Sequence, residues 1–264
     1  MRVERRPGLS CSEFVASYLM SSRPVVVDDA ISRWPSAELT TAEFFPARFG
    51  NELVQVYDDL FELQDVCALQ EYLDRYWWSK PEGGPVPYVR WYAKFKNQDF
   101  IWADAAFAVL APHWHNPYFL PRTGYILPRA VPGKVTDPVR DAFPGKGIFI
   151  SAAGGRTRLH RDPWCSDAVL CQLSGHKRVL MYGPQRPAEA EIDDILEAGE
   201  VLFIPCGWYH QVEVLTNSVS LTWNFVHAAN IRRFQRYLGE RHSADEEAVL
   251  AFFLGEPAHE TGYD

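Results

Sequence analysis

The pattern of apolar and polar residues divides the chain into a mixed first part and a strand-rich second part. Apolar side chains recur at helical spacing from Ser12 to Met20 and from Ala68 to Trp77, which predicts helices there. Short β-type runs lie between and after them, at 24–27, 53–57 and 88–95. We therefore expect a mixed α/β region over residues 1–115.

From Gly147 onward the pattern changes to short β-type runs that are separated by turn residues. The runs cover 148–150, 168–173, 178–182, 201–204, 211–215 and 218–226. Gly154-Gly155, Gly183-Pro184 and Pro205-Cys206-Gly207 are typical of the turns between such strands. Many short strands at this spacing indicate a β-sandwich or barrel, including the jelly-roll class.

Two further segments complete the domain organisation. Residues 112–146 are rich in proline, glycine and aromatic residues, which predicts loops. After residue 229 helical spacing returns, at 231–238 and 248–254. We expect a single domain over 1–264, with a mixed α/β part (1–115), a jelly-roll core that carries the metal site (116–228) and C-terminal helices (229–264). These helices pack on the core or form a homodimer.

Composition and charge narrow the classes of function. The apolar share of 47% and the aromatic share of 14% are enough for a sizeable core and a lined pocket. The net charge of −8, without a Lys/Arg run, disfavours nucleic acid as a partner. No apolar run reaches the roughly 18–20 residues that cross a bilayer, so we expect no membrane association. Five cysteines without a CxxC pair are typical of reduced thiols in a cytoplasmic protein.

The segment Leu159-His160-Arg161-Asp162-Pro163 carries the candidate chemistry. Residues i and i+2 of a strand point to the same side, so His160 and Asp162 can face one metal ion. A single His-x-Asp pair is weak evidence, because such pairs also arise by chance. The best third ligand is His210, which follows a strand and a Pro/Gly turn. Two histidines and one carboxylate leave three positions open, which is the ligand set of non-haem Fe(II) oxygenases.

Three polar residues near this cluster extend the hypothesis. Lys177 follows a strand, and a cosubstrate with two carboxylates needs such a cation at its distal end. Thr157 is positioned to donate a hydroxyl to the same carboxylate, and Asn224 is a polar group inside an apolar strand that needs a partner. The alternatives are a solvated hairpin charge for Lys177 and a plain β-favouring residue for Thr157.

These motifs resemble the Jumonji-C/cupin-8 family of 2-oxoglutarate oxygenases over about 149–226. The family shows T/S-x-x-H-x-D, then G-x-K, then G-(D/E)-x-(L/I)-F-(I/V)-P-x-x-W-x-H, and here these stand at 157–162, 175–177 and 199–210. The resemblance implies a mainly β fold with flanking helices and a double-stranded β-helix (cupin-like jelly-roll) core. It also implies Fe(II) bound by His160, Asp162 and His210, with O2 and 2-oxoglutarate as cosubstrates.

The resemblance further implies residue roles and a reaction. Thr157 and Lys177 would bind 2-oxoglutarate, together with Asn224 and with Tyr92, which matches a tyrosine on an earlier strand of the family. The implied reaction is hydroxylation of a C–H bond, and we expect an amino-acid side chain as substrate, in a protein or peptide or as a free or carrier-bound amino acid. One departure is Ala168, which stands where the family often has asparagine.

Two other functions fit parts of the pattern. A cupin metalloenzyme with Zn(II) or Mn(II) would use the same three ligands as an isomerase or hydrolase, but it needs no cation for a dicarboxylate. A non-catalytic binding module of the same fold would commonly have lost a metal ligand. Aromatic residues near the cluster line a substrate cleft or belong to the core: Trp164, Trp208, Tyr209 and those from Trp102 to Tyr118.

Overall fold

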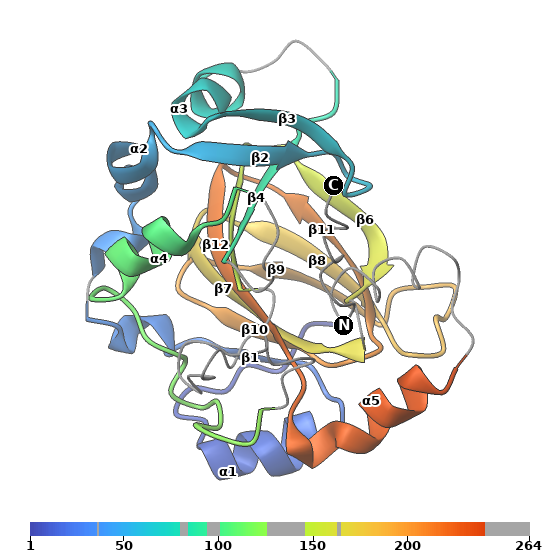
Figure 1. The fold of residues 1–264 in the computed structure, drawn as a ribbon. Coiled ribbons are helices and arrows are strands. Elements are labelled where there is room, and N and C mark those ends of the chain that lie inside the picture. The colour runs from blue at the N-terminus through green and yellow to red at the C-terminus, as the bar shows by residue number, and fades with distance from the viewer. Residues whose placement is uncertain (36, 80–83, 94–100, 126–145, 163–164, 241–264) are drawn as a thin grey trace, which may run out of the picture.

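The computed structural model describes the chain except for residues 36, 80–83, 94–100, 126–145, 163–164 and 241–264. Two sheets of antiparallel strands form its centre (Figure 1). The larger sheet has the strand order β1-β10-β7-β12-β5-β4-β2-β3, and the smaller one has the order β6-β11-β8-β9. The mainly β fold predicted from the sequence is therefore confirmed.

The strands of the larger sheet are β1 (Val25–Val27), β2 (Leu53–Tyr57), β3 (Leu63–Ala68), β4 (Tyr88–Tyr92), β5 (Gly147–Ser151), β7 (Asp167–Ser174), β10 (Val201–Ile204) and β12 (Ser218–Phe225). The smaller sheet contains β6 (Arg156–Arg161), β8 (Lys177–Tyr182), β9 (Ile192–Leu196) and β11 (Tyr209–Val214). The α-helices are α1 (Cys11–Phe14), α2 (Phe44–Phe49), α3 (Leu69–Tyr72), α4 (Asp104–Leu110) and α5 (Ile231–Leu238). Two π-helical turns continue α1 and α3, over Val15–Leu19 and Leu73–Trp77, and 3-10 turns cover Ile31–Arg33, Ala37–Thr40 and Ala228–Asn230.

The eight strands from β5 to β12 form the jelly roll. Consecutive strands alternate between the two sheets, except that β8 and β9 both belong to the smaller one. As a result β10, β7, β12 and β5 are neighbours in the larger sheet, and β6, β11, β8 and β9 make up the smaller one. This order is the double-stranded β-helix, and it confirms the core that the sequence predicted. The N-terminal strands add to the larger sheet at both sides, with β1 beside β10 and β4 beside β5.

Apart from its edge strand β3, which is largely exposed, the larger sheet is buried on both faces, and this explains its nearly continuous apolar strands. All eight residues of β7 are buried. Its outer face packs against the N-terminal helices and loops, where the Phe14 ring lies 4.9 Å from that of Phe203 and the Trp114 ring 5.1 Å from that of Trp223. Its inner face meets the smaller sheet through a second cluster that includes Leu170, Leu202 and Met181. The space between the sheets therefore has an apolar end, and the site lies beyond it.

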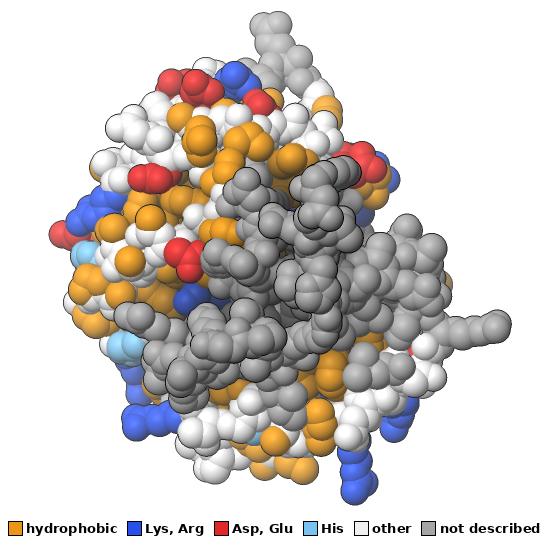
Figure 2. All heavy atoms as spheres, in the orientation of Figure 1, with side chains coloured by type: hydrophobic (Ala, Val, Ile, Leu, Met, Phe, Trp, Pro, Cys, Tyr) orange, Lys and Arg blue, Asp and Glu red, His pale blue; other side chains and the backbone are white. Residues whose placement is uncertain are grey.

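The predicted helices over 12–20 and 68–77 are confirmed, each as an α-helix continued by a π turn. The predicted helix over 248–254 lies outside the described residues. In the described part of the chain, no helix combines the length and apolar character that crossing a membrane requires. On the described part of the face in Figure 2, acidic and basic side chains are interspersed among apolar ones.

Candidate metal centre

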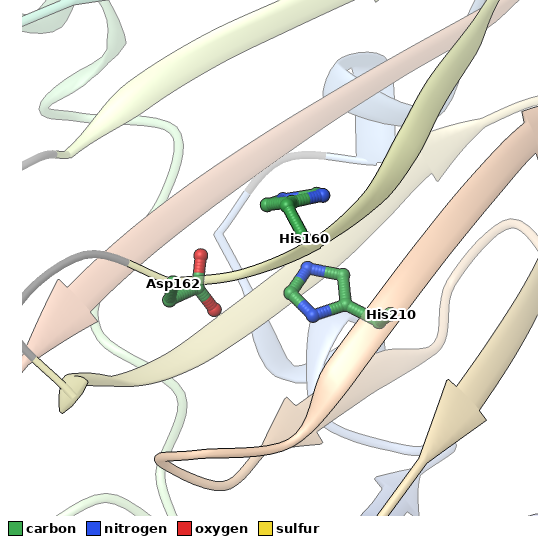
Figure 3. A group of neighbouring side chains, drawn as sticks. All are labelled: His160, Asp162 and His210. Atoms are coloured by element: carbon green, nitrogen blue, oxygen red, sulfur yellow. The ribbon is translucent and has the colours of Figure 1, made fainter. Parts of the chain in front are cut away.

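The three side chains that the sequence predicts as metal ligands converge between the sheets. His160 lies on β6, Asp162 lies just past the end of β6, and His210 lies on the neighbouring strand β11 (Figure 3). The antiparallel register pairs His210 directly with His160. One ligand atom from each of the three residues lies within 4.8 Å of the others. These atoms can therefore contact a single ion.

An irregularity in the pairing of β6 with β11 sets the direction of the side chains on β6. Val212 pairs with Thr157 and His210 pairs with His160, so β6 contains one more residue than β11 over this stretch. Residues three apart in a regular strand would face opposite ways. Because His210 and Val212 share a face of β11, the bulge brings their partners Thr157 and His160 onto one face as well.

Hydrogen bonds orient both imidazoles. The Nδ1–H of His160 donates to the carbonyl oxygen of Arg158 at 2.7 Å, and Nδ1 of His210 lies 3.4 Å from the carbonyl oxygen of Trp208. A carbonyl oxygen only accepts, so the proton of each ring stands on Nδ1. Nε2 of each ring keeps its lone pair, which is the state that binds a metal.

Burial sets the charge of the cluster. It lowers the pKa of His210 to about 4, and burial together with His210 lowers the pKa of His160. Burial raises the pKa of Asp162, while the charge of His160 and hydrogen bonding by the amide of Asn224 act the other way. The Oδ2 atom of Asp162 is buried and has no hydrogen-bond partner among the described residues. Two neutral imidazoles beside an unsatisfied carboxylate oxygen fit a divalent cation.

Lys177 is an internal residue and not a solvated hairpin charge. Only 1% of its surface is exposed, and Nζ donates to Oγ of Ser220 at 2.6 Å. Oγ of Ser220 in turn donates to Oε1 of Gln172 at 2.8 Å. Burial and the charge of Arg90 lower the pKa of Lys177 to about 7. A buried ammonium of this kind can bind an anionic group that enters the site.

The other predicted cosubstrate residues lie around the same space. The Thr157 hydroxyl is buried and accepts a hydrogen bond from the Val212 amide at 3.2 Å, which leaves its own proton to donate. Tyr92 is half-buried on β4, and burial raises its pKa, with a smaller contribution from the charge of Asp162. Asn224 is half-buried on β12, where its amide donates to Oγ of Ser166 at 3.1 Å.

Ala168 and the predicted aromatic lining have definite positions. Ala168 on β7 pairs directly with Asn224 on β12. The side-chain amide that the family often has at the Ala168 position is therefore present here on the neighbouring strand.

The predicted aromatic lining divides between two places. Trp208 packs against the apolar cluster between the sheets, and Trp114 packs against the core behind the larger sheet, away from the site. Tyr209 lies near the guanidinium groups of two arginines. Trp164 lies outside the described residues.

Sequence reasoning missed Arg90 and Phe61. Arg90 is 1% exposed on β4, and its guanidinium carbon lies 3.8 Å from the centre of the Phe61 ring. That ring also meets the imidazole of His160, at 4.9 Å between centroids. The alternation of Tyr88, Arg90 and Tyr92 along one strand was a signal, because it places the arginine on the face of the predicted cosubstrate tyrosine.

Known proteins of one enzyme class are similar to the chain. The arginine-specific demethylase JMJ20 of Arabidopsis thaliana is 23% identical over 94% of this chain and 62% of its own length. The human 2-oxoglutarate and iron-dependent oxygenase JMJD4 is 24% identical over 92% of this chain and 66% of its own length. The chain thus spans somewhat less than two-thirds of these relatives. No model of a known protein family matches it.

Among solved structures, the ribosomal oxygenase YcfD of Escherichia coli aligns with a TM-score of 0.48 and 20% identity, over 100% of this chain and 64% of that one. The sequence relatives match this chain over more than nine-tenths of its length. The chain is therefore a homologue of the Jumonji-C 2-oxoglutarate and iron-dependent oxygenases.

Proposed function

We propose that this protein is an Fe(II)- and 2-oxoglutarate-dependent oxygenase that hydroxylates an amino-acid side chain in a protein or peptide. The observation that carries the proposal is the convergence of His160, Asp162 and His210 between the sheets, in a space that also holds the buried ammonium of Lys177. The names of the relatives, an iron-dependent oxygenase and an arginine-specific demethylase, support the reaction class and a polypeptide substrate.

Iron, when bound, supplies the activation of O2, coupled to the oxidative decarboxylation of 2-oxoglutarate to succinate and CO2. The protein would hold the ion through the Nε2 atoms of His160 and His210 and the carboxylate of Asp162. The hydrogen bond from His160 to the Arg158 carbonyl fixes one ring in the ligating tautomer. Because His160 and His210 are neutral near pH 7, metal binding displaces no proton from them.

Lys177 binds the distal carboxylate of 2-oxoglutarate in this proposal, and the hydroxyl of Thr157 donates to the same carboxylate. Tyr92 and Asn224 contact the cosubstrate nearer the metal, since both interact with Asp162. The chain's apolar and aromatic surroundings exclude water from these charged contacts, which strengthens them.

The buried Lys177 weighs against the two other functions. An isomerase or hydrolase built on the same three ligands has no use for a buried cation at this place, which raises the energy of the folded protein. A binding module without catalysis would be free to lose both this cation and a ligand. The chain has all three ligands and the lysine.

Succinate formation tests the proposal. Purified protein with Fe(II), 2-oxoglutarate and O2 should convert 2-oxoglutarate to succinate slowly without substrate, and faster with peptides from a proteome digest, in which mass spectrometry detects a +16 Da product. Asp162→Ala and His160→Ala should abolish both signals and metal binding. Asp193→Asn, which removes an exposed carboxylate paired with Arg178, is the matched control and should leave both unchanged. Unchanged succinate formation in Asp162→Ala would refute the proposal.

Several narrower expectations stay predictions. A homodimer through the C-terminal helices would use α5 and residues 241–264, and the latter lie outside the described residues. The expectation that nucleic acid is not a partner rests on the net charge of −8 and on the lack of a Lys/Arg run in the sequence. A free or carrier-bound amino acid is the alternative substrate, and assays with peptides and with free amino acids separate the two.

A further inference from the structure

Arg90 is a buried cation whose guanidinium has no hydrogen-bond partner among the described residues. The residue is 1% exposed, and the Nε, Nη1 and Nη2 atoms are all buried and unsatisfied. Buried charges in proteins are normally paired, because an unpaired one loses its hydration without compensation. A guanidinium that is kept in this state indicates a binding partner that enters from outside the chain.

The groups around Arg90 are mainly aromatic. Its guanidinium carbon lies 3.8 Å from the centre of the Phe61 ring, 5.5 Å from that of Tyr88 and 5.7 Å from that of Tyr57. Burial lowers the pKa of Arg90, and the carboxylate of Asp58 acts weakly in the opposite direction. That carboxylate already accepts two backbone amides and one glutamine side chain in the turn between β2 and β3. The arginine therefore contacts ring faces, and its guanidinium donates to no carboxylate among the described residues.

The register of the larger sheet places Arg90 level with Lys177. Arg90 pairs with Phe149 of β5 from one side, and Ser220 of β12 pairs with Phe149 from the other. Directly paired residues share a face, so Arg90, Phe149 and Ser220 form one row on the inner face. Lys177 reaches Ser220 from the opposite sheet, at 2.6 Å. The charge of Arg90 adds to burial in lowering the pKa of Lys177, as expected of two cations in one space.

We propose that Arg90 and Lys177 together form a two-cation clamp for the distal carboxylate of 2-oxoglutarate. The inference rests on the proposed function and adds a second anchor to it. A guanidinium can donate two parallel hydrogen bonds to one carboxylate, and an ammonium supplies a point charge at its side. With two cations around the distal carboxylate, the site should bind a 2-oxo acid that has this carboxylate more tightly than a 2-oxo acid without it.

Arg90→Met tests the clamp, because methionine keeps much of the apolar stem and removes the charge. Calorimetry on the Mn(II)-loaded protein without O2 gives the Kd for 2-oxoglutarate. We expect it to rise about 30-fold or more, since a hydrogen-bonded charge contact in a buried site is lost. The Kd for Mn(II) should stay unchanged. The Kd for 2-oxopentanoate, which lacks the distal carboxylate, should be weak and equal in both proteins.

The stability of the metal-free protein gives an independent readout. Arg90→Met should unfold at the same or a higher temperature than wild type, because it removes an uncompensated buried charge. Arg90→Lys should restore part of the affinity for 2-oxoglutarate. Arg75→Met is the matched control, since Arg75 is an exposed arginine paired with Asp65, and it should leave the affinity unchanged.

Three results would overturn the clamp. An unchanged Kd for 2-oxoglutarate in Arg90→Met would do so, including the case in which only the Kd of a polypeptide substrate rises. A lower unfolding temperature of Arg90→Met, without rescue of affinity by Arg90→Lys, would assign Arg90 a structural role. If metal-loaded wild type fails to bind 2-oxoglutarate, the proposed function fails and takes the clamp with it.

Discussion

Replacing Lys177 by methionine should make the cosubstrate-free protein more stable at neutral pH. Lys177 is 1% exposed, and Nζ donates a hydrogen bond to Oγ of Ser220 at 2.6 Å. Burial, and secondarily the charge of Arg90, lower its pKa from 10.5 to about 7. The lysine thus carries its charge in the folded state only at a cost in free energy, and the Lys177→Met protein lacks that cost.

The sign and size of the effect follow from the two pKa values. Between pH 7 and pH 10.5 the unfolded chain holds this proton and the folded chain does not, so the free energy of unfolding rises with pH. At about 1.4 kcal/mol per pKa unit, the full cost approaches about 5 kcal/mol at pH 7 and below, and it vanishes near pH 10.5. Relaxation around the charge and the lost hydrogen bond reduce the net gain of Lys177→Met to about 1–3 kcal/mol at pH 7.

Urea unfolding at pH 7, 8 and 9, without metal or 2-oxoglutarate, measures this difference. The advantage of Lys177→Met over wild type should shrink steadily as pH rises, since other titrating groups are common to both proteins and cancel. Arg178→Met, which removes an exposed cation of the same strand, should leave the urea midpoint almost unchanged at every pH. A Lys177→Met protein that is less stable than wild type by the same amount at all three pH values would refute the reasoning.

Three further predictions concern the cosubstrate, the N-terminus and one turn. Binding of 2-oxoglutarate at pH 7 should take up about half a proton, because Lys177 with its pKa of about 7 becomes fully protonated beside a carboxylate; calorimetry in buffers of different ionisation enthalpy measures this, and zero uptake would contradict it. Arg5→Leu should lower the free energy of unfolding by about 1–3 kcal/mol, because two buried carboxylates each lose a guanidinium contact of 2.7 Å; an unchanged urea midpoint would speak against this. Gly175→Ala should cost about 2 kcal/mol or more, because its φ of +72° is strained for alanine and the added Cβ would lie 2.1 Å from a backbone oxygen. Gly199→Ala, with a φ of +94° but open space around it, should cost less in the same thermal unfolding experiment.

The sequence by itself determined the fold class, most of the strands and the candidate ligands. Apolar runs bounded by turn residues identified β5, β7, β8, β10, β11 and β12, because strands buried on one or both faces carry few polar residues. It missed β3 and β9, and in β9 Asp194 occupies a buried position. That carboxylate is satisfied by Arg5, which is 189 residues away, and no local pattern contains such a partner.

Only the tertiary structure decided how the candidate residues meet. The pairing of His160 with His210 depends on the register of β6 with β11, and the bulge between them is what brings Thr157 to the same face. Arg90 looks like an ordinary polar residue of a strand until the jelly roll closes. The guanidinium is then buried, with no hydrogen-bond partner in the described part of the chain. Local periodicity fixes which residues share a face of one strand. The chemistry between strands arises from long-range pairing, which that periodicity does not contain.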